Sequence, residues 1–145
     1  MKYAVGCDPN AVSLKETLVS DLKSGGHHVQ DFGSEDPVYA NVAITVAEAV
    51  AAGEYDRGLL LCGTGIGVSI AANKVKGAVA ALVSDAYSAE RAIKSNNANI
   101  ICMGAFTLGR ETARSCLRVW NTAEFDPSSP SAPKVKRFVE YDASR

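Results

Sequence analysis

Short apolar runs and helical segments alternate five times along this chain, and this alternation constrains the fold more than any other feature of the sequence. We predict strands at residues 3–7, 28–32, 57–61, 78–83 and 99–103. We predict helices at residues 14–23, 42–52, 67–74, 87–95 and 111–120. Strands that alternate with helices are joined by right-handed crossovers. The expected fold is therefore a three-layer α/β/α arrangement, with a five-stranded parallel sheet between two layers of helices.

The C-terminal segment has a different composition from the rest of the chain. Residues 126–133 are rich in Pro and Ser and are predicted to form a loop, and residues 135–142 form a last short helix. We therefore expect one α/β domain over residues 1–125, followed by a C-terminal loop and helical arm over residues 126–145. The arm is too short to be a domain, and we expect it to contact another subunit; the alternative is that it frays.

Composition and cysteine spacing indicate a reduced protein of the cytoplasm. The chain has 145 residues, of which 47% are hydrophobic, and its net charge of −1 gives no general attraction to nucleic acid or anionic membranes. The four cysteines include no CxxC pair, so we expect neither disulfides nor a zinc site. No apolar run reaches about 18 residues, and the N-terminus lacks the layout of a signal peptide. We expect no metal, no cofactor, no nucleic-acid or membrane partner, and a cytoplasmic location.

The most informative local stretch is Leu59–Gly67, where a buried strand is predicted to lead through Cys62 into a glycine-rich turn and then a helix. We call residues 62–67 the glycine loop. Its three glycines allow a tight turn and close approach of a ligand to the backbone. A helix that begins there directs several N–H groups at one point, which suits an anion or a developing oxyanion. The alternative interpretation is a glycine-rich turn beside an inert buried cysteine.

Two familiar phosphate-binding motifs do not fit the spacing of the glycine loop. A P-loop ends in Gly-Lys-Ser/Thr, whereas Val68 follows Gly67. The dinucleotide fingerprint needs glycines at its first, third and sixth positions, which Gly63, Gly65 and Gly67 do not match. A nucleotide-binding module is therefore supported only by the general layout of the chain, which is weak evidence for function.

Cys62 is the leading candidate for chemistry. A cysteine just before a helix N-terminus, beside several N–H groups, is in a setting that favours the thiolate form. Those groups can also stabilise an oxyanion on a substrate, which fits either nucleophilic attack or proton abstraction next to a carbonyl. The two histidines, His27 and His28, stand at the amino end of the second strand, so the sequence argues against a Cys–His hydrolase.

Four other side chains are candidates for substrate contacts, and each has an ordinary structural alternative. Asp8 follows the first strand and is either an acceptor for substrate hydroxyls or a turn residue. Thr64 either donates its hydroxyl to a ligand or stabilises the turn. Asn96 follows a helix, where Asn is common as a C-cap, and Tyr39 lies on a loop, where packing alone would explain it.

The glycine loop and the residues after it resemble the signature of a known family. The segment 62–67, with its continuation over residues 69–75, resembles the signature of the ribose-5-phosphate isomerase B/galactose-6-phosphate isomerase family. Further matches fall in the family's order: Gly6-Cys7-Asp8, Asp31-Phe32-Gly33, Tyr87-Ser88-Ala89 and Asn96-Asn97-Ala98-Asn99. The resemblance covers about residues 1–125. It implies a Rossmann-like five-stranded sheet, a metal-free aldose–ketose isomerase, and a homodimer or homotetramer with sites at subunit interfaces.

The resemblance also implies roles for the site residues. Cys62 would be the base that moves a proton between C1 and C2 of a phosphorylated sugar through a cis-enediol(ate). Thr64 and Asp8 would contact substrate oxygens, and Tyr39 would line the site. Asn96 and the backbone amides of the glycine loop would stabilise the enediolate. The loop residues that would bind substrate are Gly63, Gly65, Ile66 and Gly67.

The chain departs from the family's pattern at several positions. Pro9 replaces a His, Ser95 replaces the His used for opening the sugar ring, and Phe106 replaces a phosphate-binding Arg. Residues 128–131 stand where the family has a Gly-Gly-Arg-His tail. The candidates for the missing phosphate ligands are Lys134, Lys136, Arg137 and Arg110.

These departures favour a short, open-chain substrate. A tetrose 4-phosphate cannot close a five-membered ring, because its O4 carries the phosphate, so its isomerase needs no ring-opening His. Residues 39–41, 87–91 and 95–97 also look like the branch of the family that acts on erythrulose 4-phosphate. Two alternatives stay open: ribose-5-phosphate isomerase B itself, and a non-catalytic partner subunit of a hetero-oligomer like galactose-6-phosphate isomerase. The lost His and Arg positions favour a partner subunit, whereas the retained Cys62 opposes it.

Overall fold

The computed structural model describes all residues from 1 to 145 and contains one five-stranded parallel sheet with the order β2-β1-β3-β5-β4. The strands are β1 (Lys2–Cys7), β2 (His28–Asp31), β3 (Arg57–Cys62), β4 (Ala80–Leu82) and β5 (Ile100–Gly104). The helices are α1 (Val12–Ser24), α2 (Tyr39–Ala51), α3 (Ile66–Ala72), α4 (Ala86–Lys94), α5 (Arg110–Thr122) and α6 (Ala132–Ala143), with a short 3-10 turn, η1, over Pro9–Ala11. This architecture confirms the predicted α/β fold.

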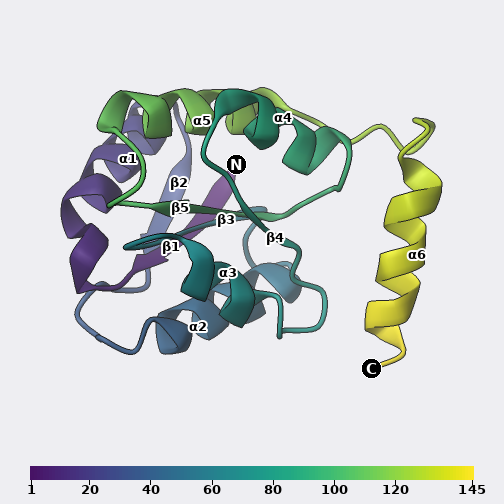
Figure 1. The fold of residues 1–145 in the computed structure, drawn as a ribbon, viewed down its shortest axis with the longest axis horizontal. Helices are drawn as coiled ribbons and strands as arrows, with labels where there is room; N and C mark the ends of the chain where they lie inside the picture. Colours follow the sequence, from purple (N-terminus) through teal and green to yellow (C-terminus); the bar gives the residue numbers. More distant parts are fainter.

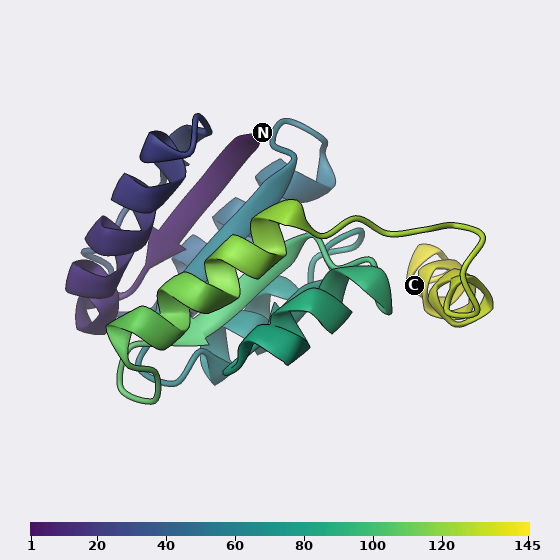
Figure 2. The ribbon, with the colours of Figure 1, turned by 90° about the horizontal axis from the view of Figure 1, so that it is seen from above.

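The helices cover the sheet as two layers (Figures 1 and 2). Helices α1, α4 and α5 pack on one face, where Trp120 and Leu18 are fully buried against strand residues such as Tyr3. Helices α2 and α3 pack on the other face, where Val46 and Val68 are fully buried. The middle strand β3 is buried on both faces, as expected for an apolar run in a parallel sheet.

The strand order places a topological switch point between β1 and β3. The chain leaves β1 for α1 on one face and leaves β3 for α3 on the other, so the two loops diverge at neighbouring strand ends. Cys7 pairs with Leu61 in the β1–β3 ladder, so Asp8 and Cys62 come next, side by side. Open α/β sheets bind ligands in the crevice at such a point.

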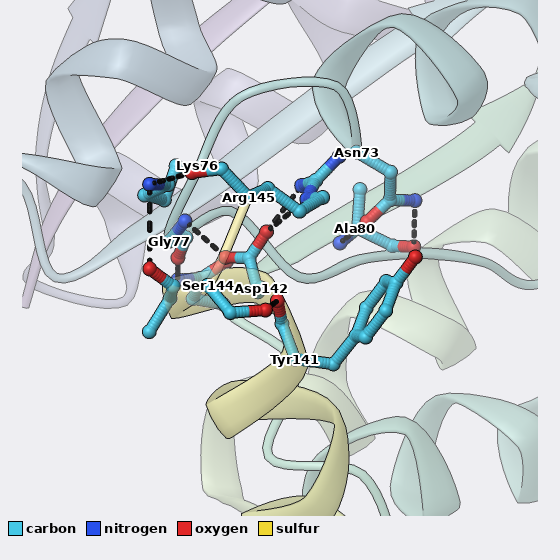
Figure 3. A network of polar contacts seen from close by, with 10 residues as sticks. Asn73, Lys76, Gly77, Ala80, Tyr141, Asp142, Ser144 and Arg145 are labelled. Carbon is cyan, nitrogen blue, oxygen red and sulfur yellow. Dashed lines mark hydrogen bonds and ion pairs between the residues drawn. The ribbon is translucent and has the colours of Figure 1, made fainter.

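The C-terminal arm forms helix α6, which stands apart from the two layers (Figure 1). Its far end is held at the turn between α3 and β4, where Asp142 accepts a hydrogen bond of 2.7 Å from Gly77 N (Figure 3). Lys76 Nζ donates to the backbone oxygens of Ala143 and Arg145, and Arg145 pairs with Asp142. The arm is therefore anchored at the edge of the sheet where the strands begin. No helix in the chain combines the length and the hydropathy that crossing a membrane would require.

Candidate active site

Cys62 is the last residue of β3, and its sulfur is held by the glycine loop. Gly65 N donates a hydrogen bond of 3.1 Å to Cys62 Sγ, and the cysteine is only 5% exposed. Gly65 has φ of 78°, a left-handed conformation that glycine adopts without strain and that closes the turn back onto the sulfur. The backbone amides of Gly63, Thr64 and Gly67 donate to no acceptor in the protein. The loop therefore combines a thiol with free N–H donors.

Two aromatic rings press against glycines of this loop. A Cβ on Gly63 would lie 2.9 Å from the ring of Phe106, and a Cβ on Gly67 would lie 2.5 Å from the ring of Tyr39. Both distances are too short for any real side chain at these positions. Phe106 comes from the β5–α5 loop and Tyr39 from the start of α2. These two glycines thus allow both rings to lie against the backbone of the glycine loop.

Asp8 lies beside Cys62 at the end of β1. Its backbone N donates to Leu61 O at 3.2 Å, and the residue is 5% exposed. Its carboxylate accepts hydrogen bonds from Asn10 N at 3.0 Å and Asn10 Nδ2 at 3.4 Å, which caps η1. Thr64 is exposed on the loop, and its Oγ1 accepts from Ile66 N at 3.2 Å. The sequence-predicted residues Asp8, Tyr39, Cys62 and Thr64 and the loop glycines therefore come together in one chain.

Two of the predicted site residues lie elsewhere. Asn96 follows α4, which runs from the carboxyl end of β4 back to the start of β5, and the neighbouring Asn99 O accepts from Gly58 N near the start of β3. Asn96 is thus separated from Cys62 by the length of a strand, about 13 Å at 3.3 Å per residue. Lys134 is exposed on α6, and this helix too is anchored at the edge of the sheet where the strands begin, which we call the amino edge. Neither side chain reaches the glycine loop of its own chain.

A cavity lies beside the glycine loop. It has a volume of about 240 Å³ and is lined by Asn10, Ser13, Leu14, Ala105, Phe106, Leu108 and Arg110. Arg110 Nη2 donates to Ser13 Oγ at 3.4 Å, and Arg110 forms none of the ion pairs of the chain. Two of its lining residues connect the cavity to the glycine loop region. The ring of Phe106 lies against Gly63, and Asn10 donates a hydrogen bond to Asp8. It therefore offers a cation without a carboxylate partner close to the glycine loop.

The other three cysteines occupy different environments. Burial raises the pKa of the Cys7 thiol to about 11, and burial also raises the pKa of Cys102 and of Cys116. All four cysteines are free. No cluster of three His, Cys, Asp or Glu side chains could hold a metal ion. Cys62 is distinguished from the other three because its sulfur accepts a hydrogen bond from the backbone amide of Gly65.

Comparison with known proteins adds to this geometry. The sequence matches the family described as Ribose/Galactose Isomerase over residues 3–138. It is 44% identical to D-erythrulose-4-phosphate isomerase 2 of Mycolicibacterium smegmatis over 150 residues, which covers 99% of each chain. It is 46% identical to ribose-5-P isomerase B of Listeria innocua over 145 residues, covering 98% of this chain and 97% of that protein. The fold is similar to the structure of ribose-5-phosphate isomerase B of Clostridium thermocellum, with a TM-score of 0.93, 37% identity and 99% of each chain covered.

Proposed function

This chain belongs to the ribose/galactose isomerase family of sugar-phosphate isomerases, and we propose that it interconverts erythrulose 4-phosphate with its aldose isomer, using Cys62 as the base. In this reaction the Cys62 thiolate removes a proton from C1 of the ketose. The electrons of the C1–H bond form the C1=C2 double bond of a cis-enediolate, whose charge lies on O2. The thiol then returns the proton to C2 while the hydroxyl proton of O1 passes to O2, so that C1 becomes the aldehyde carbon. The observation that carries the proposal is the 3.1 Å hydrogen bond that fixes Cys62 Sγ within the glycine loop.

The free amides of the glycine loop support an enediolate mechanism. Negative charge develops on a substrate oxygen next to the carbon that loses its proton, and preorganised N–H donors lower the energy of that state. Gly63, Thr64 and Gly67 supply three such donors without an acceptor of their own. Asp8 and the Thr64 hydroxyl are the side chains beside Cys62 that would contact the substrate oxygens, and the ring of Tyr39 would form a wall.

The cavity at Arg110 suits the phosphate end of a short substrate. A guanidinium binds phosphate oxygens through paired N–H groups, and Arg110 has no carboxylate partner that would compete. Ser13 and Asn10 add hydrogen-bonding groups to the same cavity. We therefore favour Arg110 over Lys134 as the phosphate ligand within one chain. Arg110→Met should raise the KM for the sugar phosphate about tenfold or more, since a charged hydrogen bond contributes about 1.5–3 kcal/mol, and Lys134→Met should leave it unchanged.

A homo-oligomer would explain how Asn96 and Lys134, which do not reach the glycine loop of their own chain, can lie at a site. Large apolar side chains are exposed on α3 and β4 next to the loop, with Ile66 at 50%, Ile70 at 56% and Leu82 at 45% exposure. An exposed apolar surface of this kind is typical of an interface. A second copy docked there would cover these side chains and could bring its Asn96 and its C-terminal arm to the site. Light scattering of the purified protein would contradict this part of the proposal if it gave the mass of a monomer.

A comparison of substrates tests the proposed function. We expect kcat/KM for erythrulose 4-phosphate to exceed that for ribose 5-phosphate, because Ser95 provides no imidazole for ring opening. Cys62→Ala serves as the inactive control. Faster turnover of ribose 5-phosphate would favour a ribose-5-phosphate isomerase, as named for the Listeria innocua relative. A purified homo-oligomer without activity on any sugar phosphate would instead favour a non-catalytic partner subunit.

A further inference from the structure

Asp8 and Lys15 are the two polar side chains that are buried in this chain, at 5% and 4% exposure. Asp8 belongs to the proposed active site, whereas Lys15 lies on α1 and no motif accounts for it. Burying an ammonium group is costly, and its partner often only offsets the cost of desolvation. An apolar residue at this position of α1 would therefore stabilise the folded state at least as well. The burial of Lys15 thus calls for an explanation other than the stability of the core.

The partner of Lys15 is Asp31, the last residue of β2. Lys15 Nζ lies 2.7 Å from Asp31 Oδ2 and 3.0 Å from Asp31 Oδ1. The same Oδ1 accepts a hydrogen bond of 2.9 Å from Gly33 N, which holds the loop after β2 in a turn. Gly33 has φ of 116°, so this turn requires glycine. The ion pair therefore fixes the position of the Gly33 peptide.

The Gly33 peptide in turn holds the end of β1. Gly33 O accepts a hydrogen bond of 3.1 Å from Cys7 N, and the next residue, Asp8, donates from its backbone to Leu61 O at 3.2 Å. Leu61 precedes Cys62. The end of β1 is thus clamped between the Gly33 loop on one side and β3 on the other. These groups meet at a cavity of about 370 Å³ lined by Cys7, Lys15, Asp31, Gly33 and neighbouring residues.

We propose that Lys15, acting through Asp31 and Gly33, is a positioning residue that sets the Asp8 carboxylate against the substrate at Cys62. This inference rests on the proposed function, in which Asp8 contacts substrate oxygens. Loss of the ammonium frees the Asp31 carboxylate to turn toward water, and the Gly33 turn and the end of β1 then relax together. A displacement of a contacting group by about 1 Å costs on the order of 10²-fold in rate. Lys15 needs no contact with the substrate to have this effect.

A second ion pair of α1 provides a matched control. Arg114 Nε and Nη2 lie 2.7 Å and 2.8 Å from the Asp21 carboxylate and join α1 to α5. Neither partner bonds to the backbone at a strand end. Arg114→Met therefore removes this ion pair of α1, together with the 3.1 Å bond from Arg114 to Glu111 on its own helix, and leaves the clamp on β1 intact.

The experiment compares Lys15→Met with Arg114→Met by steady-state kinetics, at a temperature where both variants are folded. We expect kcat/KM to fall about 10²-fold for Lys15→Met and less than twofold for Arg114→Met. In an Asp8→Ala background the further effect of Lys15→Met should shrink to less than threefold, because Lys15 would then have no carboxylate left to position. Equal activity of the two variants, or an undiminished effect of Lys15→Met in the Asp8→Ala background, would overturn the proposal.

A second measurement does not depend on catalysis. Amide hydrogen exchange at Cys7 and Asp8 should be faster in Lys15→Met than in Arg114→Met, and equal exchange would contradict the inference. If the wild-type protein isomerises no sugar phosphate, the proposed function fails, and the exchange result still decides whether Lys15 holds the end of β1. If Lys15→Met does not fold, Asp31→Asn takes its place, because the Asp31 side chain is 45% exposed. We expect the same loss of activity and the same cancellation with Asp8→Ala for that variant.

Discussion

The two edges of this sheet are held together in different ways. At the amino edge, side chains close the structure: Arg57 donates to the carbonyls of Trp120 and Ala123 at the end of α5, the second at 2.7 Å. Tyr3 Oη donates to Asn121 Oδ1 at 2.5 Å, and burial raises the pKa of Tyr3 to about 12. At the carboxyl edge, the Lys15–Asp31 pair holds the ends of β1 and β2, whereas around Cys62 the backbone closes the structure, with Ala105 N and Phe106 N donating to the carbonyls of Cys62 and Gly63 at 2.9 Å and 2.8 Å.

Because of this difference, we expect residues that stabilise the fold and residues of the candidate active site to lie at opposite edges of the sheet. Polar side chains at the amino edge are occupied by other parts of the protein, so their removal leaves buried groups unpaired. Around Cys62 the backbone carries the structure, so the Cys62 thiol, the Thr64 hydroxyl and three backbone amides are bonded to no other side chain. We therefore expect variants of the amino edge to change the free energy of unfolding and variants of the carboxyl edge to change turnover.

The largest effect should come from Cys62→Ser, which keeps the shape of the side chain and removes the thiolate. We expect kcat/KM to fall by about 10²- to 10⁴-fold, the usual contribution of a positioned base, with little change in melting temperature. Cys102→Ala is the control, because Cys102 is fully buried in the neighbouring strand β5. That variant should lose stability and retain turnover per folded molecule. Substantial activity in Cys62→Ser would contradict the role of the thiol.

The second largest effect on turnover should come from Gly67→Ala. The new Cβ would lie 2.5 Å from the ring of Tyr39, and this ring can swing away because Tyr39 is 43% exposed. We therefore expect the fold to survive and kcat/KM to fall about 10- to 100-fold as the wall of the site is displaced. Gly109→Ala is the matched control, since a Cβ there meets nothing within 4 Å. Equal activity of the two variants would mean that the ring of Tyr39 is no part of the site.

Local sequence signals predicted the parts of the molecule that local interactions determine. The alternation of apolar runs and helical segments was sufficient for the sheet, and the glycine loop was recognisable because Cys62 and its three glycines are contiguous. The cavity at Arg110 could not be predicted, because Ser13 and Arg110 meet only after β1, β3 and β5 are placed side by side. The pairing of Lys15 with Asp31 has the same origin, since it depends on α1 lying across β2.

Asn96 and Lys134 differ in how far the sequence determines their positions relative to Cys62. A helix that follows a strand in this fold returns to the amino edge, so the position of Asn96 after such a helix already placed it away from Cys62 within one chain. Lys134 is different, because the arm is positioned by Gly77 and Asp142, which are far apart in sequence. No local pattern reveals such an anchor.

At the amino edge, Arg57→Met should destabilise the protein by about 2–4 kcal/mol, since two buried carbonyls of α5 lose hydrogen bonds from a charged donor. Urea unfolding measures this loss, and kcat/KM at a temperature where the variant is folded should stay unchanged. The control is Arg118→Met, because the Arg118 side chain bonds only to Ser115 on its own helix, at 2.9 Å. We expect a change within about 0.5 kcal/mol there, as for most surface substitutions. A loss of activity in Arg57→Met would show that the two edges are coupled.

The smallest effect should be acid sensitivity at the pair between α1 and α5, which belongs to neither edge. The hydrogen bonds from Arg114 lower the pKa of Asp21 below its usual value, so this pair stabilises the folded state above the unfolded pKa of about 4. That stability is lost as the pH falls through the lowered pKa. Because both side chains are about one-third exposed, at 35% and 32%, solvent screening limits the contribution to about 1 kcal/mol or less. Urea unfolding should therefore give a difference between wild type and Arg114→Met that is larger at pH 7 than at pH 3, whereas an equal difference would assign the effect of Arg114 to packing and leave its charge without a role in stability.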